Sequence, residues 1–96
     1  MGVFHPNADE MHGFTVVITT SDGGAYIGRW MEQEGGRVRI VDACHCSGEA
    51  EGARDAFIKK AATWGVEAQA PQLFVQSDLI ESVRKLGDVA TELRGW

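Results

Sequence analysis

The first half of the chain alternates β-branched segments with glycine-centred turns, and this arrangement constrains the fold more than any other feature. Residues 14–20 are β-branched or aromatic almost throughout, which favours a strand because such side chains pack well on a pleated surface. Turns at residues 21–24 and 34–36 contain the glycines that tight hairpins need. Together with segments 25–31 and 37–43, the pattern predicts a meander of three strands on short connections.

The second and third segments of this meander each contain one further structural signal. Val38 and Ile40 alternate with Arg37 and Arg39, so we expect the aliphatic pair to face the core and the arginines to face solvent. Gly28 lies inside the second segment, where a glycine marks a sharp bend, a bulge or the close approach of another backbone.

Size and charge limit the class of protein. At 96 residues the chain is predicted to form a single domain, residues 1–96. A domain of this size buries only about 60–70% of its unfolded surface, so association that buries more apolar area would stabilise it. The net charge of −5 argues against a DNA partner. The sequence shows neither a membrane-spanning apolar run nor a signal-peptide pattern, and its cysteines are expected to be free thiols, so we expect no membrane partner and a cytoplasmic location.

Two helices are predicted outside the meander. A short one covers residues 7–12, and a longer one covers about residues 49–64. In the longer helix, Phe57 and Trp64 belong to one apolar stripe at helical spacing. We expect this stripe to pack on the sheet or on a neighbouring subunit.

The last third of the chain fits more than one interpretation. Residues 73–76 predict a strand, whereas residues 78–94 have apolar spacing that leans toward a helix. Leu79–Val83 can instead form another short strand. In that case Asp88 can cap a short terminal helix over residues 89–94.

Several segments carry a resemblance to a known family. Residues 22–30 combine an Asp-Gly turn with an aromatic-aliphatic-Gly step at Tyr26-Ile27-Gly28, and residues 36–42 alternate aliphatic side chains up to an acid. This pattern resembles the first signature of the Sm and Sm-like (LSm, Hfq-related) proteins. Leu73–Ile80 is similar to the strand-turn-strand segment of their second signature.

The resemblance implies a fold and a mode of assembly. The fold is mainly β: an Sm-like (SH3-like) five-stranded bent and closed barrel with a short N-terminal helix and a helical insertion, about residues 49–64, between strands three and four. Under this interpretation Leu79–Val83 is a strand. Family members form rings by pairing the fourth strand of one subunit with the fifth of its neighbour, and an unpaired edge strand invites such pairing. The interface expected for a homo-oligomeric ring comprises Leu73, Phe74, Val75, Leu79, Ile80 and Val83.

The resemblance also points to RNA, although the positions that contact RNA differ. Arg37 stands where Sm proteins carry an Asn that reads a base edge, and Gln76-Ser77 stands where they carry an Arg-Gly pair. We therefore predict a non-catalytic, ring-forming binding or scaffolding module. Its RNA site, at Arg37, Arg39, Gln76 and Ser77, is expected to be degenerate. The alternative is an RNA-binding Sm-like protein that uses Arg37 and Arg39.

Cys44-His45-Cys46 is the one cluster of soft metal ligands in the sequence. Structural zinc sites usually have two to four residues between paired cysteines, whereas one residue separates Cys44 from Cys46. This set would therefore need further ligands, such as His5 or His12. A cysteine nucleophile would also need an oriented base in a cleft. We expect one cysteine to pack inward and the other to lie with His45 in a loop, with no enzyme activity and no cofactor. A metal or thiol site at these residues is the competing hypothesis.

Overall fold

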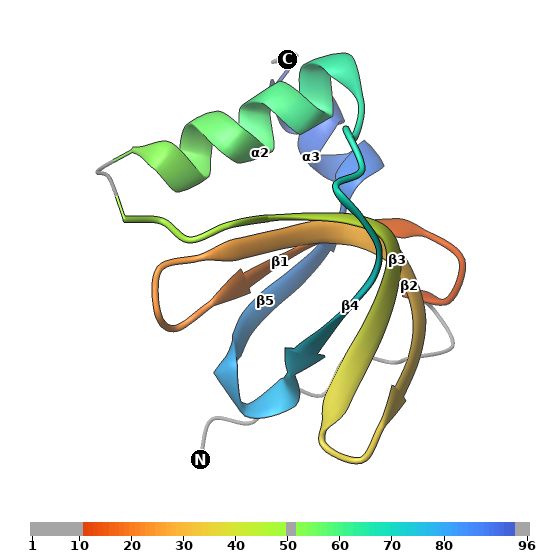
Figure 1. Ribbon diagram of the computed structural model, residues 1–96. Helices are drawn as coiled ribbons and strands as arrows, with labels where there is room; N and C mark the ends of the chain where they lie inside the picture. Colours follow the sequence, from red (N-terminus) through yellow and green to blue (C-terminus); the bar gives the residue numbers. More distant parts are fainter. Residues whose placement is uncertain (1–10, 50–51, 94–96) are drawn as a thin grey trace.

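A computed structural model of the chain describes residues 11–49 and 52–93 (Figure 1). Its elements are β1 (Thr15–Thr20), β2 (Ala25–Glu34), β3 (Arg37–Cys46), α2 (Ala53–Trp64), β4 (Ala70–Gln76), the 3₁₀ turn η1 (Ser77–Leu79), β5 (Ile80–Lys85) and α3 (Leu86–Leu93). The predicted helix over residues 7–12 lies almost entirely outside the described residues. None of the helices described is long and apolar enough to cross a membrane.

The strands form one five-stranded antiparallel sheet in the order β4-β3-β2-β1-β5. The predicted meander is present as β1, β2 and β3. The hairpin of β2 and β3 is longer than expected, because Ala25 still pairs with Cys46 at the end far from the turn. The sheet is strongly bent, so its two outer strands approach each other at the lower end of the molecule in Figure 1.

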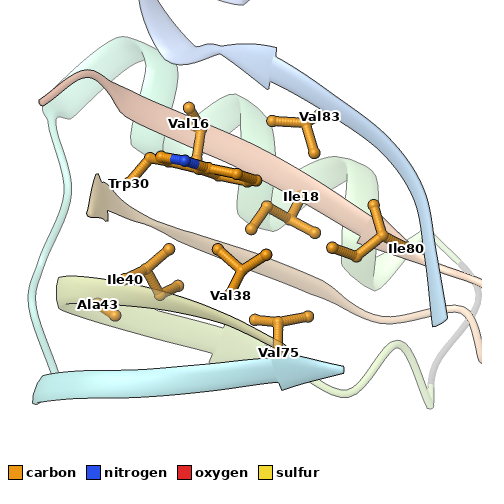
Figure 2. Close-up of a cluster of buried hydrophobic side chains, with 9 residues drawn as sticks. All are labelled: Val16, Ile18, Trp30, Val38, Ile40, Ala43, Val75, Ile80 and Val83. Carbon is orange, nitrogen blue, oxygen red and sulfur yellow. The ribbon is translucent and has the colours of Figure 1, made fainter. Parts of the chain in front are cut away.

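The larger hydrophobic cluster fills the inside of this bend, and every strand contributes to it (Figure 2). Its buried members are Val16, Ile18, Trp30, Val38, Ile40, Ala43, Val75, Ile80 and Val83. Val38 and Ile40 have no exposed surface, which confirms the direction predicted from their alternation. Burying a Val or Ile side chain contributes about 1.5–3 kcal/mol, so this cluster is the main source of stability.

The bend is located where Gly28 of β2 faces β3. Ile27 pairs with Cys44 and Arg29 pairs with Val41, so two residues of β3 oppose this single glycine in a β-bulge. A Cβ atom added to Gly28 would lie 3.0 Å from the Ala43 Cβ and 3.0 Å from the Val41 carbonyl oxygen. The close approach and the bulge that the sequence predicted at Gly28 are therefore both present.

Helices α2 and α3 cover the opposite face of the sheet (Figure 1). A second cluster joins this face to both helices through Val17, Ile27, Cys44, Ala61 and Val89. Helix α2 begins at Ala53, later than the predicted residue 49. The preceding Gly52 has φ of 79°, a left-handed conformation that does not continue a right-handed helix.

The apolar stripe of α2 is only partly used. Phe57 packs against the cluster under the helices, as expected. Trp64, the last residue of α2, is 82% exposed and does not pack on the sheet of its own chain. The chain turns away directly after it, at Gly65 with φ of 91°. The prediction that the stripe packs on a neighbouring subunit therefore remains untested for Trp64.

The predicted barrel is not closed. β4 pairs only with β3 and β5 pairs only with β1, so the sheet keeps two edges within the described residues. The physical reason lies in η1, where the Ser77 amide donates to the Gly36 carbonyl at 2.9 Å. This bond directs the chain across the open end of the bent sheet, in place of the tight hairpin that would pair β4 with β5.

The ambiguous last third contains both a strand and a helix. The strand predicted over Leu79–Val83 is present as β5, shifted to Ile80–Lys85. Helix α3 begins directly after it at Leu86, earlier than the expected residue 89. Pro71 lies inside β4, where an edge position tolerates its missing amide.

We expect Gly28→Ala to lower the free energy of unfolding by about 1–3 kcal/mol, because overpacking at a close contact forces the backbone apart. Gly87→Ala is the matched control. Gly87 lies in α3 with no atom within 4 Å of an added Cβ. That variant should leave stability unchanged or raise it by up to about 1 kcal/mol. Urea unfolding of both variants measures the difference, and equal stabilities would contradict the role given to Gly28.

Candidate functional site

The β2–β3 turn and the end of β4 come together at one end of the sheet, and this brings most of the predicted RNA-site residues into one place. Arg37 is the cross-strand partner of Gln76. The Ser77 amide donates to the Gly36 carbonyl at 2.9 Å, which ties the start of η1 to the turn. The register of β3 with β4 therefore positions Arg37, Arg39 and Gln76 around a common opening.

Glu32 holds Arg39 in a two-point ion pair across the β2–β3 hairpin. Arg39 Nε donates to Glu32 Oε2 at 2.5 Å, and a terminal guanidinium nitrogen donates to Oε1 at 2.9 Å. This hydrogen bond lowers the pKa of Glu32 and raises the pKa of Arg39. The lowered pKa keeps Glu32 charged to a lower pH than an unpaired glutamate, so the pair is lost as the pH falls through this lowered pKa.

Arg37 points to a different neighbour. Its guanidinium carbon lies 4.4 Å from the centre of the Phe74 ring, in cation–π geometry. A hollow of about 330 Å³ opens beside this pair. It is lined by Glu32, Glu34, Gly35, Arg37, Arg39, Phe74 and Gln76. Its charged side chains are two carboxylates and two guanidinium groups, so the hollow has no net positive charge.

Ser77 does not belong to this surface. Its side chain is buried, and its hydroxyl oxygen accepts a hydrogen bond from Gln33 Nε2 at 3.2 Å. The sequence analysis placed Ser77 with the RNA site, but the structure uses it to hold η1 against β2. Glu32 and Phe74 were not identified as parts of the site. Glu32 could have been found, because it and Arg39 lie at equal spacing from the turn between β2 and β3.

The Cys-His-Cys segment lies in β3, so the expectation of a loop is wrong. Cys44 is buried in the cluster under α2, and His45 stacks on Tyr26 with ring centres 4.2 Å apart. Successive side chains of a strand point to opposite faces, so Cys44 and His45 diverge. Cys46 is half-buried. Within the described residues, no three His, Cys, Asp or Glu side chains group as metal ligands.

The residues expected at a subunit interface divide into two sets. Val75, Ile80 and Val83 are buried in the core of their own chain, so their side chains are not free for a neighbour. Leu73 packs partly against the same cluster. Phe74 and Leu79 are 43% and 39% exposed. The strands that carry these residues, β4 and β5, still present unpaired backbone edges within the described part of the chain.

We predict that Cys44 reacts more slowly than Cys46 with a thiol reagent at neutral pH. Burial raises the pKa of the Cys44 thiol, and the thiolate is the reactive form. Alkylation with iodoacetamide followed by peptide mass spectrometry measures the two rates. Unfolding in urea should abolish most of the difference in alkylation rate between the two cysteines. Faster labelling of Cys44 in the folded protein would contradict its position under α2.

Comparison with known proteins identifies the fold. No protein-family model and no curated protein matches the sequence. Among solved structures, the Pyrococcus abyssii Sm protein in complex with a uridine heptamer aligns with a TM-score of 0.53 and 11% identity, over 81% of this chain and 90% of that one. The SmAP (LSm) protein of Methanococcus vannielii aligns with a TM-score of 0.52 and 18% identity, over 79% and 84%.

A third structure aligns over more of the chain. A chain in the crystal structure of the NatC complex bound to CoA has a TM-score of 0.54 and 9% identity, and covers 94% of this chain and 97% of its own length. Identities this low establish the fold alone. The bent sheet of five antiparallel strands described above is therefore an Sm-like fold.

Proposed function

We propose that this chain is a non-catalytic Sm-like module that assembles into a ring of identical copies and serves as a binding or scaffolding unit. In this ring, β4 of one copy pairs with β5 of the next. The hollow at the β2–β3 turn is a degenerate form of the family RNA site. The observation that carries the proposal is the pair of unpaired strand edges at the two borders of one bent sheet.

The two borders are suited to each other. β4 has seven residues and β5 has six, so the two edges have nearly equal length. Unpaired amide and carbonyl groups on an edge are a template for another strand. Phe74 on β4 and Leu79 beside β5 add exposed apolar area near these edges. Pairing between copies would satisfy both edges with a single repeated contact, as a heterologous ring interface requires.

The charges of the hollow argue against family-type RNA binding. Arg39 is neutralised by Glu32, and Arg37 is the other arginine of the hollow, stacked on Phe74. Single-stranded RNA is held by positive grooves that follow the backbone and by aromatic platforms. One arginine on a chain of net charge −5 is a weak version of such a groove. The Pyrococcus protein is in complex with a uridine heptamer, whereas the charge balance of the hollow in this chain supports a different role.

The thiols support a role without catalysis. A nucleophilic cysteine needs a base oriented toward it. Cys44 is buried under α2, while the neighbouring His45 stacks on Tyr26 at the other face of β3. Burial also raises the pKa of Cys44, which disfavours the thiolate.

Native mass spectrometry of the purified chain tests the assembly. We expect a multimer of five or more subunits, and Phe74→Asp should shift it to monomer because a charge on an edge strand opposes pairing. Phe74 is 43% exposed, so the variant should keep the native circular dichroism spectrum. Ala56→Asp, at an exposed position of α2, is the control that should still assemble. A wild-type monomer across micromolar concentrations would refute the proposal.

Binding to a short uridine-rich RNA at several salt concentrations tests the degenerate site. We expect no salt-dependent binding by the wild type. Glu32→Gln releases Arg39 and should add about 0.7 to the slope of log K against log salt for each new phosphate contact. Glu34→Gln is the matched control, because it leaves the ion pair of Arg39 with Glu32 in place. Wild-type binding that Arg37→Ala abolishes would instead establish the RNA-binding alternative.

A further inference from the structure

Trp64 is the largest exposed apolar side chain among the described residues, and it borders a groove. The groove has a volume of about 310 Å³ and lies where α2 ends above β3. It is lined by Cys44, Phe57, Lys60, Ala61, Trp64, Gly65, Val66, Glu67 and Gln69. Its floor and walls are mainly apolar, whereas Lys60 and Glu67 are exposed. Such a groove fits an apolar side chain better than a charged ligand.

The groove lies beside the β4 border of the sheet. Gln69, one of its lining residues, donates its amide hydrogen to the Ala43 carbonyl at 2.8 Å. Ala43 is also the partner of Ala70, the first residue of β4. The groove therefore opens on the helix-covered face, next to the start of the strand that would receive a neighbour.

Helix α3 starts at the other border of the sheet. It follows β5 without a linker, and Arg84 of β5 forms an ion pair with Glu92 of α3. Val89 packs in the same cluster as Ala61 of α2, so both helices cover one face of the sheet. Leu93, at the end of α3, is 48% exposed.

We propose that Trp64 and its groove receive α3 of the next copy, with Leu93 of the partner subunit as the inserted side chain. This inference rests on the proposed ring. It adds a second contact layer on the helix-covered face, outside the strand pairing itself. Each copy then contributes its groove at one border and its α3 at the other.

The placement follows if β4 of one copy pairs antiparallel with β5 of the next. The chain reverses through the three residues of η1, so β4 and β5 run in opposite directions (Figure 1). Antiparallel pairing between copies would place Ala70, at the start of β4, beside Lys85, at the end of β5. The groove is adjacent to the first of these residues, and α3 begins directly after the second. Antiparallel pairing would therefore bring the two features to the same end of the shared sheet.

Charge gives an independent argument for a second copy as the occupant. Lys59 and Lys60 are exposed near the groove end of α2. Asp88 and Glu92 are exposed on α3. Glu67 offsets one lysine at the groove, and Arg84 pairs with Glu92 on α3. One positive charge then remains beside the groove and one negative charge, that of Asp88, on α3, which favours this orientation over the contact of two identical faces.

Sedimentation velocity over a range of concentrations tests the inference, with tryptophan emission as a second readout. Trp64→Asp and Leu93→Asp should each raise the concentration of half-assembly about tenfold or more, because each removes apolar burial from every interface. Thr63→Asp, at the exposed neighbouring position, is the control that should not change it. Subtracting the emission spectrum of Trp64→Phe from that of the wild type isolates the emission of Trp64. We expect this emission to shift to shorter wavelength on assembly.

The outcomes separate this inference from the proposed ring. A wild-type monomer would overturn both. A ring that Phe74→Asp dissociates, but that Trp64→Asp and Leu93→Asp leave intact, would overturn only the helix-layer contact. An unchanged emission of Trp64 on assembly would overturn it as well. Trp64 is largely exposed and Leu93 about half exposed in the single chain, so the variants should fold, and circular dichroism checks that they do.

Discussion

The close approach of β2 and β3 at Gly28 is the contact on which the rest of the architecture depends. Because Gly28 has no side chain, the Val41 carbonyl and the Ala43 side chain come within the space that a Cβ would need. The extra residue of the bulge, Asp42, has φ of 48°. The resulting bend folds the outer strands toward each other, so Val75 of β4 reaches the same cluster as side chains of β5 without hydrogen bonds between the two strands. The opposite face curves outward and is covered by the helices.

The sequence predicts the meander well because its signals are local. Glycines at the turns and the alternation around Val38 act between neighbouring residues, and no distant contact opposes them. The last third differs, since Leu79, Val83 and Leu86 satisfy a helical spacing while β-pairing is also available. Tertiary contact decides between the two. Residues as far as Lys85 pair with β1, and the helix starts only beyond this last pair. Periodicity contains no information about where a partner strand ends.

Only the part of the candidate site that depends on strand pairing could be predicted from the sequence. Arg37 and Gln76 meet because strand pairing places them opposite each other, and the family resemblance identified both positions. The ion pair of Arg39 with Glu32 changes the chemistry of the site, and it follows from hairpin geometry that the sequence analysis did not use. The burial of Ser77 could not be read from the sequence, because it depends on η1 crossing the open end of the sheet to meet the β2–β3 turn.

In an assembly, pairing of the two free edges and contact between the helices would restrict different parts of the geometry between copies. Strand pairing fixes the distance between copies, yet two strands can still rotate about their common direction, and a heterologous contact closes into a ring only at particular angles. A second contact away from the strands removes this freedom. Trp64 ends α2 and Leu93 ends α3, the two helices that cover one face of the sheet, and both side chains leave apolar area exposed in the single chain. The proposed interface of two layers would bury both side chains and would restrict the angle between copies, which strand pairing alone does not do.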